Sequence, residues 1–130
     1  MITIKISDLL NSTDALSKLA KINLKARPAF YASKLIKAAD AEIQEFNDTR
    51  LNLIKKYGEK DENGELITDD KGNCKIMPDS VSTFQQELKE LIDVEIELNV
   101  DKIKIEDIEN IELTPEDMTI LEKFINFEDD

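Results

Sequence analysis

The strongest constraint on the fold is a helical pattern that runs from Arg27 to Tyr57. This stretch has no Gly, and Pro28 lies in the first turn, where a helix does not need the missing N–H. The pattern predicts one helix about 45 Å long, ended by Gly58 in a left-handed conformation. Apart from the interruption at Arg50, its apolar stripe consists of Ala32, Leu35, Ala39, Ile43, Phe46, Leu53 and Tyr57.

A helix of this length needs a partner, and the sequence offers one after Asp79 or Ser80, either of which can cap a helix. Its predicted apolar stripe consists of Val81, Phe84, Leu88 and either Leu91 or Ile92. Packing of the two stripes predicts an antiparallel α-hairpin over residues 27–92. Turn residues dominate the connection 58–78, which predicts a small β-hairpin at the tip.

The two ends of the chain show a β pattern. Ile2, Ile4 and Ile6 alternate with polar residues. A helical pattern with a break near residues 11–13 follows up to Ala20, and a short connection from Asn23 to Ala26 leads into the long helix. Alternation returns over residues 93–98 and again at 103–105, so we expect a three-stranded antiparallel sheet. Extension of the preceding helix through residue 97 remains an alternative.

The final helix has the clearest start signal. Thr114 is a predicted N-cap, Pro115 suits the first helical position, and Leu113 and Met118 occupy the positions of a hydrophobic staple. Met118, Leu121, Phe124 and Ile125 form its predicted buried face. The expected fold class is therefore α+β, a single domain in which 1–26 hold a strand and helix, 27–92 the hairpin, and 93–130 strands and a C-terminal helix.

Composition narrows the setting of the protein. With 130 residues, 41% hydrophobic and 35% charged, the chain is long enough for a core without staples. Apolar runs are too short to span a membrane, and the N-terminus does not have the pattern of a signal peptide. The single cysteine, Cys74, excludes an internal disulfide, so we expect an intracellular protein.

The charge of the chain is strongly negative and uneven. Its net charge is −12. Residues 1–60 have eleven Lys and Arg against seven Asp and Glu, a net of +4, whereas residues 61–130 have six against twenty-two, a net of −16. Such a field disfavours nucleic acid and anionic lipid and favours basic protein surfaces. Solubility alone is the simpler interpretation.

The sequence has little catalytic equipment. It contains no histidine and three glycines, which excludes Ser-His and Cys-His pairs and phosphate-binding glycine loops. We therefore expect a protein without enzymatic activity, a cofactor or a metal site. The acidic turns after Asp61 and Asp69 resemble a calcium loop, but their glycines do not follow the EF-hand spacing, so hairpin turns are preferred. Cys74 is interpreted as a half-buried thiol.

One basic cluster surrounds the aromatic residues Phe30 and Tyr31, and it is the one place where nucleic acid could dock. Pairing of these cations with the acidic half of the same or a neighbouring chain is the preferred interpretation. The cluster consists of Lys18, Lys21, Lys25, Arg27, Lys34 and Lys37.

Two segments resemble a family of uncharacterised small proteins, a domain of unknown function, from tailed phages and prophages of Gram-positive bacteria. They are KLIKAADAEIQEFNDTRLNLIKKYGEKDENGE and ELTPEDMTILEKF. The similarity covers most of the chain, and its motifs are structural: a charged helix, a turn and a capped helix. The resemblance implies a viral origin and provides no catalytic or binding residue.

These observations favour a non-enzymatic protein-binding role in the host cytoplasm. The first hypothesis is an inhibitor or adaptor whose acidic half covers a basic, often nucleic-acid-binding, surface of a host protein such as a defence effector. The expected contacts are Glu95, Glu97, Asp101, Glu106, Asp107, Glu109, Glu112, Glu116 and Asp117. The alternatives are a virion or tail-assembly accessory that forms homo-oligomers, and nucleic-acid binding by the basic cluster.

Overall fold

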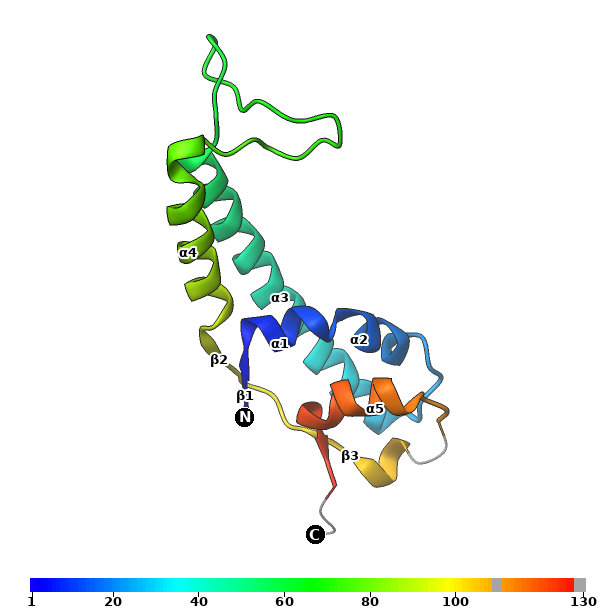
Figure 1. The fold of residues 1–130 in the computed structure, drawn as a ribbon. Coiled ribbons are helices and arrows are strands. Elements are labelled where there is room, and N and C mark those ends of the chain that lie inside the picture. The colour runs from blue at the N-terminus through cyan, green and yellow to red at the C-terminus, as the bar shows by residue number, and fades with distance from the viewer. Residues whose placement is uncertain (109–110, 128–130) are drawn as a thin grey trace. The chain divides into compact units, whose positions relative to one another are not determined.

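The computed structural model describes residues 1–108 and 111–127 (Figure 1). The fold is α+β, and its residues group into two compact units, one formed by Met1–Ile43 with Glu95–Asp130 and the other by Gln44–Val94. Helix α3 (Ala26–Tyr57) is continuous through both units, so the predicted long helix is confirmed. The expectation of one folding domain stays a prediction. In the described residues, no helix is both long enough and apolar enough to cross a bilayer.

The first unit combines short helices with short strands around the N-terminal part of α3. In chain order, its other elements are β1 (Ile2–Lys5), α1 (Ile6–Asn11), α2 (Thr13–Ala20), β2 (Glu95–Leu98), β3 (Ile103–Lys104), the 3-10 helix η2 (Ile105–Ile108), α5 (Pro115–Leu121), the 3-10 helix η3 (Glu122–Phe124) and β4 (Ile125–Asn126).

The predicted break between the first two helices is confirmed at Ser12. This residue is buried, and its hydroxyl donates a hydrogen bond to the carbonyl oxygen of Asp8 at 2.7 Å. A serine that bonds back into the preceding turn competes with helix continuation, which explains why the chain begins a new helix at Thr13.

The first sheet pairs β1 with β2 in antiparallel orientation. Ile2 lies opposite Leu98, and Ile4 lies opposite Ile96. The buried isoleucines of β1 therefore lie on the same face of the sheet as Ile96 and Leu98 of β2. Helix α4 (Val81–Ile92) ends before this strand, which excludes its extension through residue 97. The predicted strand at 93–98 is therefore confirmed.

The predicted three-stranded sheet is wrong. Strand β3 pairs instead with β4, in parallel, with Ile103 opposite Ile125. Only Ile103 and Lys104 of the alternating residues 103–105 form the strand, because the chain enters η2 at Ile105. Because a pattern of three residues indicates a strand but not its neighbour, the pairing with a distant segment was not predictable. The final helix is correspondingly shorter than expected, and Phe124 and Ile125 are buried outside it.

The core of this unit is aliphatic. Side chains from β1, the first two helices, α3, β2, β3 and the C-terminal segment form one buried cluster, which includes Ile2, Leu9, Leu19, Leu35, Leu98, Ile103, Leu121 and Phe124. Each large side chain contributes roughly 1.5–3 kcal/mol when it leaves water. The N-terminal and C-terminal segments are therefore joined by a shared hydrophobic interior.

The second unit is an α-hairpin that is shorter than the one predicted over residues 27–92, because the part of α3 up to Ile43 belongs to the first unit. Figure 1 shows α4 running back along the C-terminal part of α3. The rings of Tyr57 and Phe84 meet edge to face, with centroids 6.4 Å apart. Phe46 is buried, but no residue of α4, a helix that the structure describes in full, is buried. Ser80 occupies the predicted N-cap position without a capping side-chain hydrogen bond.

The connection between the two helices contains two similar turns rather than one hairpin. Asp61 Oδ1 accepts hydrogen bonds from the backbone N–H groups two and four residues later, at 2.9 and 3.0 Å. Asp69 Oδ1 does the same at the same distances. Gly64 and Gly72 take positive φ angles of 79° and 82° at equivalent positions. This internal repeat was not predicted from the sequence.

A closed ring of backbone hydrogen bonds joins these turns to the end of α3. The N–H of Glu59 donates to the carbonyl of Lys75 at 2.8 Å, and that of Lys75 donates to Ile67 at 2.8 Å. The N–H of Ile67 donates to Glu59 at 2.9 Å and completes the ring. Three segments thus satisfy one another's backbone N–H and C=O groups without forming a regular β-ladder.

Gly58 has a different role from the one predicted. In residues 1–108 and 111–127, Gly64 and Gly72 are the glycines with positive φ, so Gly58 is not a left-handed helix cap. A Cβ atom at Gly58 would lie 2.5 Å from the carbonyl oxygen of Ile54 and 2.6 Å from Leu66 Cδ2. Glycine is required here because the backbone passes too close to its neighbours for a side chain.

We expect Gly58→Ala to lower the free energy of unfolding by about 1–3 kcal/mol, because the added methyl group must displace backbone. Urea denaturation followed by circular dichroism measures this effect. Gly64→Asn is the matched control, since open space surrounds that position and Asn tolerates a left-handed backbone. An equal loss of stability in both variants would contradict the close-packing explanation.

Candidate functional site

Most of the predicted acidic contacts are exposed on the first unit. Glu95 and Glu97 lie on β2, Glu106 lies on η2, and Glu116 lies in the first turn of α5. The exposed members of the set are Glu95, Glu97, Asp101, Glu106, Glu112 and Glu116. Asp107 is half-buried, and Glu109 lies outside the described residues. These carboxylates lie on β2, η2, α5 and the connections between them, all in the acidic half of the chain.

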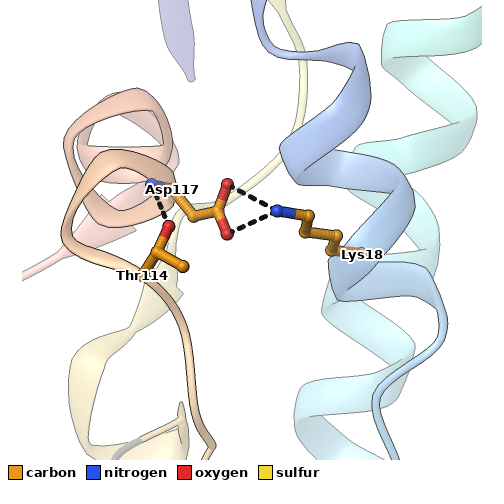
Figure 2. A network of polar contacts seen from close by, with 3 residues as sticks. All are labelled: Lys18, Thr114 and Asp117. Carbon is orange, nitrogen blue, oxygen red and sulfur yellow. Dashed lines mark hydrogen bonds and ion pairs between the residues drawn. The ribbon is translucent and has the colours of Figure 1, made fainter.

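Asp117 is an exception, because it is buried and pairs with a cation of the same chain. Figure 2 shows its carboxylate facing Lys18 of α2, whose Nζ lies 3.0 Å from Oδ2 and 3.3 Å from Oδ1. The side chain of Asp117 is 9% exposed. A nearly buried carboxylate that already has a cation partner has a structural role, and its assignment to partner binding stays a prediction.

The same carboxylate lies next to the N-terminal turn of α5. The predicted cap is confirmed, because Thr114 Oγ1 accepts a hydrogen bond from the N–H of Asp117 at 3.1 Å. The hydrogen bond from Lys18 is the main cause that lowers the pKa of Asp117, and Thr114 contributes in the same direction. Burial opposes this effect but does not overcome it.

A second ion pair also joins the two ends of the chain. Lys123 Nζ, on η3, lies 2.6 Å from Asp8 Oδ2, on α1. Both pairs connect residues 1–43 with residues 95–127. The cation–carboxylate pairing that the sequence analysis preferred for the basic cluster is therefore present for Lys18, and part of the charge asymmetry is used inside the first unit.

The cations of the basic cluster lie in different surroundings. Lys21 and Lys25 are exposed on the connection between α2 and α3. Lys34 Nζ lies 4.8 Å from the ring centroid of Phe30, a cation–π distance. Lys37 borders an apolar groove between α2 and α3, and Arg27 lines a separate cleft.

This cleft, which we call the Arg27 cleft, is the most mixed site in charge. Its volume is about 340 Å³, and besides Arg27 it is lined by Tyr31, Lys102, Lys104 and the carboxylates of Asp101 and Asp107. A second concavity of about 240 Å³ shares Tyr31 and Asp101 with it. Lys102 and Lys104 were not predicted as site residues, because lysines in an alternating pattern are typical of the polar face of a strand.

The acidic turns and Cys74 have the local structure that the sequence predicted. The Oδ1 atoms of Asp61 and Asp69 bind backbone N–H groups within their turns, which is the preferred turn interpretation. Cys74 is half-buried, as expected. In the described part of the chain, no three His, Cys, Asp or Glu side chains are grouped in a way that would hold a metal ion.

Comparison with known proteins yields no relative. No family model, no curated protein and no solved structure matches this chain.

The lowered pKa of Asp117 predicts an acid-dependent loss of stability. A depressed carboxyl pKa stabilises the fold above its ordinary value of 3.8, and this contribution disappears as the pH falls through the lower native value. The stability difference between the wild type and Asp117→Asn should therefore be constant from about pH 5 to 7 and shrink below about pH 4. Urea midpoints measured across this range test the prediction.

Glu116→Gln is the control, because Glu116 is the exposed neighbour of Asp117 on the same helical turn. Its effect on stability should be smaller at every pH. If the Asp117→Asn difference were independent of pH down to pH 2, or if Glu116→Gln reproduced it, the ion pair with Lys18 would not be the cause.

Proposed function

We propose that this chain is a non-enzymatic phage protein that binds a basic surface of a host protein and acts as its inhibitor or adaptor. A host defence protein that binds nucleic acid is the type of partner we infer, since its phosphate-binding surface is basic. The phage origin follows from the family resemblance of the helical and C-terminal segments. The chain also contains no histidine, which removes the commonest general base.

This proposal rests on the exposed carboxylates that, among the described residues, form no ion pair with a cation of the same chain. Asp117 and Asp8 have cation partners, whereas Glu95, Glu97, Glu106, Glu112 and Glu116 are exposed and take part in neither ion pair. Exposed charges of one sign attract an oppositely charged partner over about a Debye length, roughly 8 Å at physiological salt. Their main effect is therefore on the rate of association.

Neutralising these five carboxylates together should slow association with the partner about tenfold or more at low salt and flatten its salt dependence. The variant carries Glu95→Gln, Glu97→Gln, Glu106→Gln, Glu112→Gln and Glu116→Gln. The partner is first captured from host lysate and identified. Surface plasmon resonance at several salt concentrations then measures both association rates.

The control variant neutralises five exposed carboxylates of the second unit, Glu45, Glu62, Glu65, Asp70 and Asp93. Both variants change the net charge from −12 to −7, so a difference between them reports position and not total charge. Equal slowing by the two variants, or association of the wild type that does not change with salt, would contradict the proposal.

A second candidate function, an accessory protein of virion or tail assembly, is favoured by one feature of the second unit. The apolar stripe of α4 is half-buried, and Leu51, Met77 and Val81 are 45%, 39% and 37% exposed. A helix pair with so little buried surface gains stability when a second copy covers it. This candidate implies self-association through apolar contacts.

If the second candidate holds, the protein should sediment as a discrete oligomer that persists in about 1 M salt, where charge interactions are screened. Leu51→Gln with Val81→Gln should then convert it to a monomer, because polar side chains do not favour burial. Asn52→Gln with Thr83→Gln, at exposed neighbouring positions, is the control and should leave the oligomer intact. A monomer at all concentrations would favour the inhibitor or adaptor.

A further inference from the structure

The Arg27 cleft brings together cations from two distant parts of the sequence. Arg27 lies in the first turn of α3, Lys104 lies on β3, and Lys102 directly precedes that strand. The chain as a whole has a net charge of −12, so three cations beside the carboxylates of Asp101 and Asp107 make this concavity more basic than the chain on average. Cations held near one another repel, and an anion placed among them relieves this repulsion.

Among the described residues, these cations take part in no ion pair. In the part of the chain that the structure describes, the ion pairs within 4.0 Å are Lys18–Asp117 and Lys123–Asp8. Asp101 and Asp107 also line the cleft but form no such pair with the three cations. The guanidinium of Arg27 and the ammonium groups of Lys102 and Lys104 therefore remain available to a ligand.

An aromatic residue completes the cleft. Tyr31 is half-buried, and it lines both the Arg27 cleft and the adjoining concavity. Its ring also packs against Phe30, with centroids 6.0 Å apart and an interplanar angle of 66°. Beside it, the carboxylates of Asp101 and Asp107 are acceptors for hydroxyl or N–H donors. Cations, an aromatic ring and acceptors together match a ligand that has a phosphate, a flat base and polar hydrogens.

We propose that the Arg27 cleft binds a mononucleotide. Arg27, Lys102 and Lys104 contact its phosphate, Tyr31 stacks against its base, and Asp101 or Asp107 accepts hydrogen bonds from the sugar or the base. The volume of about 340 Å³ lies within the range of roughly 300–1,000 Å³ that small-molecule sites occupy. This site is separate from the acidic contacts of Glu95, Glu97, Glu106, Glu112 and Glu116.

The charge of the chain favours a mononucleotide over a nucleic-acid strand. A strand would extend beyond the cleft, where the net charge of −12 repels every further phosphate. Three phosphate-binding side chains release few counterions, which gives a polymer little affinity at physiological salt. A ligand with one phosphate places its whole charge among the cations.

The test is equilibrium dialysis of the full chain with AMP, GMP, CMP and UMP, and with inorganic phosphate and a 20-nucleotide single strand as comparison probes. We expect at least one mononucleotide to bind saturably, one per chain, and more tightly than phosphate. Arg27→Gln with Lys102→Gln and Lys104→Gln should weaken this binding about tenfold or more. Tyr31→Leu should reduce it to the affinity of phosphate, because stacking is lost.

The control variant combines Lys21→Gln, Lys25→Gln and Lys37→Gln, which changes the net charge equally at exposed positions outside the cleft. It should bind the nucleotide as the wild type does. Circular dichroism and the thermal midpoint confirm that each variant is folded; the substituted cations are exposed, so their replacement leaves the core intact.

Four results would overturn the proposal: absence of saturable binding by any mononucleotide below about 1 mM, phosphate binding as tightly as the nucleotide, binding of the single strand but not of mononucleotides, and equal weakening by the control variant. None of these results depends on the acidic contacts, so failure of this site leaves the proposed function to its own test.

Discussion

Burial of the stripe on α3 organises the first unit, because this helix presents its apolar residues to segments from both ends of the chain. Two of the buried positions are alanines, Ala32 and Ala39, on either side of the fully buried Leu35. These residues belong to one buried cluster with large side chains of the other elements of the unit. The β1–β2 sheet, the first helices and α5 all contribute to this one cluster, so the placement of the surface residues depends on it.

The described charged side chains of the first unit fall into two groups, those in ion pairs and those without an ion-pair partner. The pairs Lys18–Asp117 and Lys123–Asp8 join the basic N-terminal and acidic C-terminal parts, and each adds orientation to a contact that burial already favours. Most of the other predicted acidic contacts are exposed, while Arg27, Lys102 and Lys104 line one cleft and, among the described residues, take part in no ion pair. The bipolar sequence thus produces a fold of net charge −12 in which one cleft gathers three cations beside two carboxylates.

The sequence predicted the features that depend on local chemistry. The long helix, the Thr114 cap and the first strand follow from periodicity and capping residues within a few positions of one another. Features that depend on distant pairing were missed. The parallel pairing of β3 with β4 joins two short segments whose alternation does not identify a neighbour. Asp117 was assigned to the surface for the same reason, because nothing near it in sequence indicates Lys18. The candidate site divides in the same way, since its exposed acids were predictable and the Arg27 cleft was not.

The second unit depends less on hydrophobic burial, and more on backbone hydrogen bonds, than the first unit does. No residue of α4, all of which is described, is buried, so hydrophobic burial contributes less here than in the first unit. The connection between the helices compensates with backbone hydrogen bonds: two Asp-centred turns and the ring through Glu59, Ile67 and Lys75. Because these bonds require close approach of main-chain atoms, the glycine at position 58 is needed for contact distance and not for its freedom to adopt positive φ. The geometry of the tip therefore follows from turn chemistry in the sequence, while the exposed apolar residues of the helices remain the surface on which further burial is possible.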